Sequence, residues 1–212
     1  MIAVRWYLRF GLSYRDVEEL LAERGVEVDH VTVYRWVQRF TPLLAEAARP
    51  CRHAVGQRWL VDETYVKVAG WWRYLYRAID QFGQVIDVVV SPDVTRKQPT
   101  SSSSGQSVRP ESGRLRSSPT EHRPIRWSSM AYCQRPGTRT DRYANNAVEA
   151  DHGRLKARLR PMRGLKQDHS ATVVIAGHAF VQNLRRGHYE LAVEAPVNRR
   201  LAVAFDELAV AI

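Results

Sequence analysis

The sequence predicts a mixed α/β protein in which short helices come first and a small antiparallel sheet follows. Residues 2–45 carry apolar side chains at helical spacing. Residues 59–91 instead form runs rich in β-branched and aromatic residues, separated by Gly70 and Gly83, and this pattern is typical of strands joined by tight turns. The chain has 212 residues, enough for one ordinary domain and a small additional one.

Three helices are expected in residues 1–45. Residues 2–10 are mostly apolar, as in a buried helix whose beginning lies upstream of residue 1. Ser13 is a suitable N-cap for a second helix, with Asp16 at the position of a capping-box acid. Asp29 can cap a third helix. The inward side of this third helix is expected to carry Val33, Trp36, Val37 and Phe40.

The second and third helices, joined by a turn that contains Gly25, fit the pattern of a helix-turn-helix. In this motif the second helix presents hydrogen-bond donors to base edges and phosphates while its other side packs on the first helix. The residues expected to face DNA are Thr32, Tyr34, Arg35, Gln38 and Arg39. An ordinary three-helix bundle with a basic, solvated face is the alternative interpretation of the same residues.

Residues 46–55 are expected to form a linker, and the sheet is predicted within residues 56–93. Its strands are expected at 59–68, 71–80 and 84–91, paired as an antiparallel meander. Asp62 lies near the middle of the first strand, where the backbone can hold a carboxylate rigidly. A single Asp in a half-buried strand is more often a solvent-facing charge, so Asp62 needs a partner elsewhere in the chain to become a candidate site residue.

The charge balance favours a polyanionic partner. Lys and Arg number 32 against 22 Asp and Glu, a formal net charge of +10 with a pI near 10.0. Nucleic acid is the usual partner of such a chain, although a ribosomal or merely solubilised surface has a similar composition. The sequence contains no membrane-length apolar run and no signal-peptide pattern, which predicts a cytoplasmic protein. Cys51 and Cys133 share no metal-ligand spacing.

The character of the chain changes between residues 97 and 140. Ser, Arg and Pro make up about half of this segment, and apolar residues are scarce. Such a composition cannot bury enough apolar surface to offset the entropy of ordering the chain. The segment 97–140 is therefore expected to be disordered.

Residues 141–212 return to a helical pattern. A helix capped by Asn145 or Asn146 is expected to carry Glu149 and His152 on the same side. A longer helix is expected from about Ser170 to Tyr189, apolar around much of its circumference, and a last amphipathic stretch completes the chain.

Two stretches of the chain combine these features in an unusual way: WLVDETYVKVAGWWRYLYRAIDQFGQVID and RYANNAVEADHGRLKARLRPMRGLKQ. With a helix-turn-helix ahead of them, they resemble the DDE transposases of bacterial insertion sequences, most closely the insertion-sequence-six family. The resemblance covers most of residues 2–93 and 141–212. It implies an RNase H-like catalytic core, here incomplete, and metal-dependent DNA strand cleavage and transfer during transposition. It also implies a nucleoid-associated homo-oligomer that binds double-stranded DNA, both the terminal inverted repeats of its element and the target.

In this resemblance the Asp of the DET motif corresponds to Asp62 and the Glu of the NNAVE motif to Glu149. These carboxylates would hold two Mg²⁺ or Mn²⁺ ions, which clamp the attacking and leaving oxygens of a phosphoryl displacement. Basic residues on and after the helix of Glu149 would hold phosphates without recognising sequence. They are Lys156, Arg158, Arg160, Arg163 and Lys166, each of which is also explained as an exposed helix charge. His152 is expected to be structural or to contact phosphate.

The second Asp of the family, at the end of a further strand, has no counterpart between Lys97 and Thr140. The acids in that interval, Glu111 and Glu121, have polar surroundings. A pair of compensating frameshifts would explain why this segment alone does not resemble the family, and comparison of the gene's three reading frames tests it. The chain is then either a transposase, active or degenerate, or a DNA-binding protein without catalysis. Other acids considered for the missing position are Asp80, Asp87 and Asp141.

Overall fold

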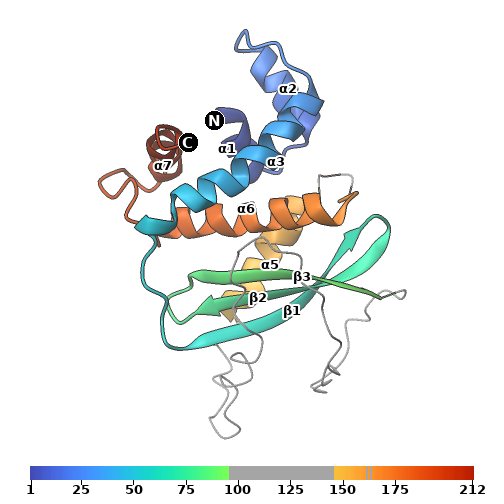
Figure 1. Ribbon diagram of the computed structural model, residues 1–212, viewed down its shortest axis with the longest axis vertical. Coiled ribbons are helices and arrows are strands. Elements are labelled where there is room, and N and C mark those ends of the chain that lie inside the picture. The colour runs from blue at the N-terminus through green and yellow to red at the C-terminus, as the bar shows by residue number, and fades with distance from the viewer. Residues whose placement is uncertain (96–145, 161, 163) are drawn as a thin grey trace, which may run out of the picture.

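The computed structural model describes residues 1–95, 146–160, 162 and 164–212, and in this part helices stack in layers on one face of a three-stranded sheet (Figure 1). In chain order the elements are α1 (Ile2–Arg9), α2 (Tyr14–Ala22), α3 (His30–Ala47), the 3₁₀ helix η1 (Arg49–Cys51), β1 (Trp59–Val68), β2 (Trp71–Asp80), β3 (Val85–Thr95), α5 (Asn146–Leu159), α6 (Asp168–Arg186) and α7 (Arg200–Ala209). The mixed α/β class is confirmed.

The sheet is the predicted antiparallel meander, with strand order β1-β2-β3. Its turns contain Gly70 at φ 85° and Gly83 at φ 83°, backbone conformations that glycine adopts without strain. The register places Asp62 of β1 directly opposite Arg77 of β2. Directly opposed residues of an antiparallel pair project from the same face of the sheet, so these two side chains share a face.

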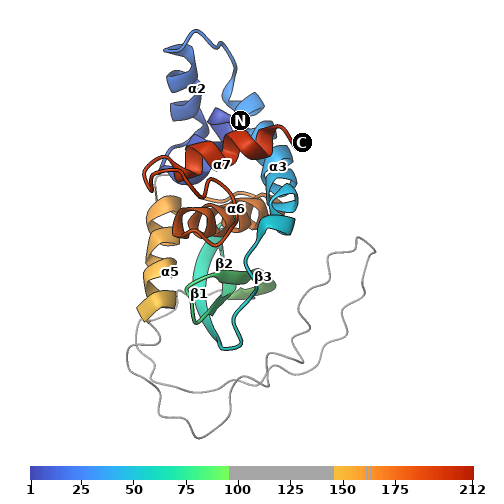
Figure 2. The same cartoon turned by 90° about the vertical axis from the view of Figure 1, so that its left-hand side faces the viewer.

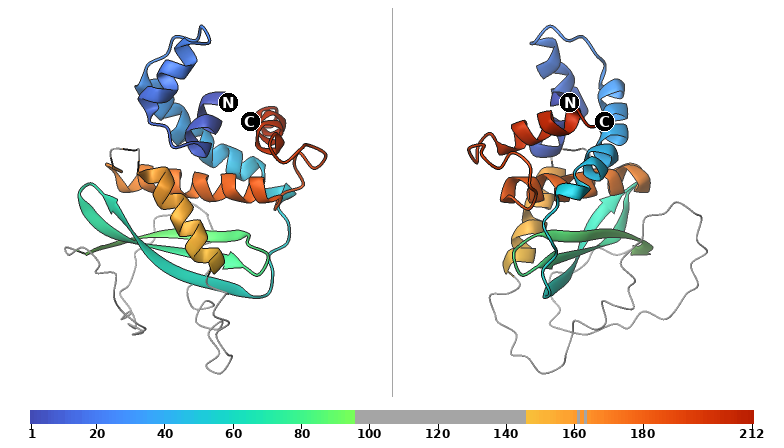
Figure 3. Two further views of the ribbon diagram at one scale, coloured as in Figure 1. Left: turned by 180° about the vertical axis from the view of Figure 1, so that it is seen from behind. Right: turned by 60° about the vertical axis from the view of Figure 1, so that its left-hand side comes forward.

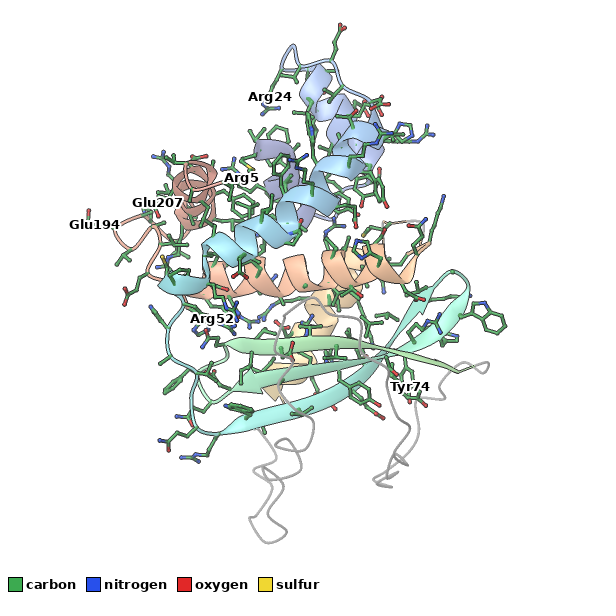
Figure 4. The ribbon with its side chains drawn as sticks, in the orientation of Figure 1. Arg5, Arg24, Arg52, Tyr74, Glu194 and Glu207 are labelled. Carbon is green, nitrogen blue, oxygen red and sulfur yellow. The ribbon has the colours of Figure 1, made fainter. Side chains whose placement is uncertain are left out.

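Side chains alternate between a covered and an open face of the sheet. Thr64, Val66 and Val68 of β1 are buried on the face that α5 and α6 cover. The opposite face carries a row of tyrosines, with ring centroids 4.9 Å apart for Tyr65 and Tyr74. Figure 4 shows Tyr74 pointing away from the helices. Because Asp62 has the same parity as Thr64, it belongs to the covered face.

Helix α6 separates the sheet from α1, α3 and α7. It lies over the sheet, and α3 crosses its other side together with α1 and α7 (Figures 1 and 3). The approach is close at Gly177 of α6, where a Cβ atom would lie 2.6 Å from Cγ2 of Thr41 and 2.7 Å from Cδ2 of Leu8. Both termini lie on the far side of α6 from the sheet (Figure 2).

The predicted starts of the N-terminal helices are confirmed. Ser13 and Asp16 form a reciprocal capping box, and the side chain of Asp29 accepts a hydrogen bond from the backbone N–H of Thr32 at 2.8 Å. In the predicted inward stripe of α3, Val33 and Val37 are buried. Trp36 and Phe40 are only half-buried and pack against the edge of the same core.

Two boundaries differ from the prediction. Helix α3 continues to Ala47, into the segment expected to be a linker. Helix α6 begins at Asp168 and ends at Arg186, because Gly187 takes a left-handed conformation at φ 80° that stops it before Tyr189. The segment 97–140, with its expected disorder, and Cys133 lie outside the described residues. None of the described helices is long and apolar enough to cross a membrane.

Candidate functional site

The structure brings the strand that carries Asp62 into contact with the helix that carries Glu149. The contact at Asp62 is made by His152 of α5, whose Nδ1 lies 3.5 Å from Oδ2 of Asp62. The side chain of Asp62 is 37% exposed and that of His152 only 7%. Burial, followed by the charges of Arg77 and Lys156, lowers the pKa of His152 to about 4, so its imidazole is neutral near pH 7.

Glu149 of α5 is exposed and lies three residues before His152. Residues at this spacing lie one turn apart on the same side of a helix. The same-side placement of Glu149 and His152 was predicted from the sequence, and through His152 that side of α5 meets β1 at Asp62. Carboxylate oxygens at Asp62 and Glu149 suit a hard divalent cation. Within the described residues, no group of three or more His, Cys, Asp or Glu side chains is arranged to hold a metal ion.

Asp80 has a structural role. It is buried and accepts hydrogen bonds from the backbone N–H groups of Gly56, Phe82 and Gln84 at 3.0, 2.9 and 2.8 Å. Burial alone would raise the pKa of Asp80, but these backbone hydrogen bonds bring it below its usual value. Asp80 braces the β2–β3 turn and is not free to replace a missing metal ligand.

Asp87 and Asp141 are the other two acids that could stand at the position of the second Asp. Asp87 of β3 accepts a hydrogen bond from the backbone N–H of Val88 at 2.8 Å and lies opposite Ala78 of β2. Asp141 lies outside the described residues.

A buried group of charges that the sequence analysis missed lies next to Asp62. Nη1 of Arg77 donates to Oδ2 of Asp151, and Nη2 of Arg186 donates to Oδ1 of the same carboxylate. The side chains of Arg77 and Asp151 are 0% exposed. Burial, with the charge of Arg186 adding to it, lowers the pKa of Arg77 to about 10. The available signal was the position of Asp151 four residues before Leu155, on the apolar side of α5.

The five residues expected to face DNA from α3 divide into two groups. Arg35 and Arg39 are exposed, and the side chain of Thr32 is half-buried. Tyr34 and Gln38 are only partly exposed, and their polar groups face neighbouring helices. The hydroxyl of Tyr34 lies 3.0 Å from Oγ of Ser170 on α6, and the amide of Gln38 is buried beside Tyr14. These two side chains turn inward because α3 packs on both α2 and α6.

The basic residues near Glu149 also fall into an exposed group and a buried one. Lys156, Arg160 and Lys166 are exposed as expected, and Arg163 lies outside the described residues. The expected exposure of Arg158 is wrong, because this residue is buried. Its Nη2 donates to the backbone O of Tyr7, and its guanidinium carbon lies 4.4 Å from the centroid of the Tyr7 ring. It lies seven residues after Asp151, two turns along the same side of α5, which is the side that the tertiary structure buries.

Comparison with known proteins identifies the family. A family model described as a DDE domain matches residues 56–101 and 127–188. Asp62 and Glu149 both lie inside the matched residues, whereas residues 102–126, within the Ser/Arg/Pro-rich segment, lie outside them. No solved structure shows a significant match.

Curated relatives give the same family. The chain is 38% identical over 166 residues to the transposase for insertion sequence-like element IS431mec of Staphylococcus aureus strain N315. It is 37% identical over 166 residues to the transposase for insertion sequence element IS257 in transposon Tn4003 of Staphylococcus aureus. Each alignment covers 74% of this chain and 72% of the relative. The chain belongs to the DDE transposases of bacterial insertion sequences, in the insertion-sequence-six (IS6) family.

Proposed function

We propose that this transposase cleaves and transfers DNA strands during transposition, with Asp62 and Glu149 as two of its metal-binding carboxylates. The observation that carries the proposal is the contact between the strand of Asp62 and the helix of Glu149, at His152. Two acids that are 87 positions apart in the sequence thereby lie on adjoining elements. An RNase H-like core that is formed by residues 56–93 and 141–212 is part of the same proposal.

DDE transposases use divalent metal ions, and Mg²⁺ or Mn²⁺ is the proposed cofactor. A bound ion would stabilise the charge that develops on the oxygens of the displaced phosphodiester. The chain's part is to hold oxygen ligands in place. Asp62 is suited to this because β2 pairs with β1 along its whole length, and because 37% of its side chain remains exposed to a ligand.

The partner is proposed to be double-stranded DNA, namely the terminal inverted repeats of the element and the target. On α3, Arg35 and Arg39 are exposed and can contact DNA as part of a helix-turn-helix within residues 1–45. Near the metal ligands, the exposed cations are Lys156, Arg160 and Lys166. They can neutralise phosphates without distinguishing bases. Assembly as a homo-oligomer on the nucleoid completes the proposal.

The test is strand cleavage and transfer on DNA that carries the ends of the element, with Mg²⁺ or Mn²⁺, beside a gel-shift measurement of binding. Wild-type protein should do both. Asp62→Asn and Glu149→Gln should each lower the cleavage rate at least about a hundredfold, since each removes a charged metal ligand, while the gel shift survives. Glu63→Gln is the matched control, because Glu63 is exposed and has the opposite parity on β1.

Three results would contradict the proposal. If the wild-type protein binds the element's ends but never cleaves them with either metal, the chain is a DNA-binding protein without catalytic activity. Loss of both DNA binding and cleavage would contradict the transposase function and also DNA binding without catalysis. Equal activity of Asp62→Asn and Glu63→Gln would show that Asp62 is not a ligand.

A further inference from the structure

We propose that Asp151 is a positioning residue, which through Arg77 and Arg186 fixes α5 on the sheet and so sets the place of Glu149 relative to Asp62. The inference rests on the proposed metal-binding role of Asp62 and Glu149. It concerns residues that touch neither DNA nor metal in that proposal.

The carboxylate of Asp151 joins three separate elements. Its two oxygens accept from Arg77 of β2 and from Arg186 of α6. Nη1 of Arg186 also donates to the backbone O of Gly83, in the β2–β3 turn, at 2.8 Å. One side chain of α5 is thereby tied both to the sheet and to the last turn of α6.

The balance of charge makes this contact hard to replace. Two guanidinium groups share one carboxylate, and the side chain of Arg77 is fully buried. Nη1 of Arg77 bonds Asp151, whereas Nε and Nη2 have no hydrogen-bond partner in the described part of the chain. A buried charge that loses its partner is strongly unfavourable. Removing the charge of Asp151 should therefore move α5 outward until water reaches Arg77.

The ionic contact of Asp151 lies next to the proposed metal ligands. Arg77 lies directly opposite Asp62 in the β1–β2 register. On α5, Asp151 comes between Glu149 and His152, and His152 contacts Asp62. Each residue advances a helix by about 1.5 Å, and productive metal geometry tolerates errors of only about 0.5 Å. A small shift of α5 would separate Glu149 from Asp62 even if the protein stays folded.

The test compares Asp151→Asn with Asp168→Asn in the full chain. Asp168 also joins β2 to α6, through an ion pair with Arg73 at 2.9 Å, but it lies outside α5. Hydrogen exchange of the α5 amides and Mn²⁺ binding, followed by electron paramagnetic resonance, are the two measurements. Asp151→Asn should speed exchange in α5 and weaken Mn²⁺ binding roughly 10- to 100-fold, the usual effect of losing a group that orients a ligand. Asp168→Asn should change neither.

A third variant separates positioning from stability. In Arg77→Met/Asp151→Leu/Arg186→Met the whole ionic group becomes apolar, a replacement that often preserves or raises stability. We expect its melting temperature to return to the wild-type value while Mn²⁺ affinity stays low. Recovery of Mn²⁺ affinity together with stability would overturn the inference, because the ionic group would then serve stability alone.

The two proposals fail in different ways. Absence of Mn²⁺ binding in the wild-type protein would contradict the metal site at Asp62 and Glu149. Unchanged hydrogen exchange of the α5 amides in Asp151→Asn would contradict the positioning role, whether or not Mn²⁺ binding changes.

Discussion

The two sides of α6 are held together by different kinds of contact. On the side away from the sheet, α1, α3 and α7 pack on α6 through apolar side chains, among them Leu8, Val37 and Phe205. On the sheet side, a smaller apolar cluster is joined by the buried charges of Arg77 and Asp151. The proposed metal ligands lie on the sheet side.

The difference shows what each kind of contact can specify. Apolar burial is roughly proportional to area and has little direction, so the helical side gains stability without fixing single atoms. Charged hydrogen bonds are directional, and a broken one leaves an uncompensated charge. A site that needs defined distances between carboxylates is thus built where the directional contacts are. Three predictions test this division, in order of decreasing effect.

Truncation in the apolar core should have the largest effect on stability and little effect on the positions of the proposed metal ligands. Phe205 is 1% exposed in the core beneath α7. Phe205→Ala should lower the free energy of unfolding by about 3–5 kcal/mol through lost burial and the remaining cavity. Denaturant unfolding measures this. Val210→Ala, at a residue that is 89% exposed, should change it by less than about 0.5 kcal/mol. Similar losses in the two variants would contradict the assignment of the core.

Arg158 and Arg160 should separate structure from DNA binding. Arg158→Met removes a buried hydrogen bond and the contact with the Tyr7 ring. We expect it to lower the free energy of unfolding by about 1–3 kcal/mol. Arg160→Met should leave stability unchanged and weaken DNA binding in a gel shift, because Arg160 is exposed. A reversed pattern would show that Arg158 reaches DNA.

The third prediction concerns pH, and close to neutral pH its effect is the smallest of the three. His178 is buried in α6, and burial, followed by the charges of Arg77, Arg158 and Arg186, lowers its pKa from 6.5 to about 3. Between these values the unfolded chain binds a proton that the folded chain does not. Stability should therefore fall as pH drops from about 6.5 towards about 3, by at most about 1.4 kcal/mol per pH unit from this residue. Denaturant unfolding of wild type and His178→Gln across that range should show a shallower slope for the variant.

Much of the fold could be predicted from the sequence because its signals are local. Ser13 with Asp16, the glycines at positions 70 and 83, and the run of β-branched residues in β1 each act within a few positions. Asp62 and Glu149 became candidates through family motifs, and the structure places their elements in contact. The expected interval for the second Asp lies outside the described residues.

What could not be predicted depends on distant partners. Arg158 and Gln38 were expected on exposed faces because Arg and Gln are mostly exposed residues. Their burial follows from the packing of α5 on α1 and of α3 on α2, which no local pattern contains. No local pattern pairs Asp151 with Arg77, since Arg77 is 74 positions away from it in the chain.

By itself, the sequence determined the helices, the strands, their caps and turns, and the family to which the two candidate carboxylates belong. These properties depend on the order of neighbouring residues. Only the tertiary structure decided which side of α5 is buried, that Asp151 joins β2 to α6, and that His152 meets Asp62. The reason is physical. A charge is buried only where an opposite charge or a hydrogen-bond acceptor comes to meet it, and that partner is brought into place by folding.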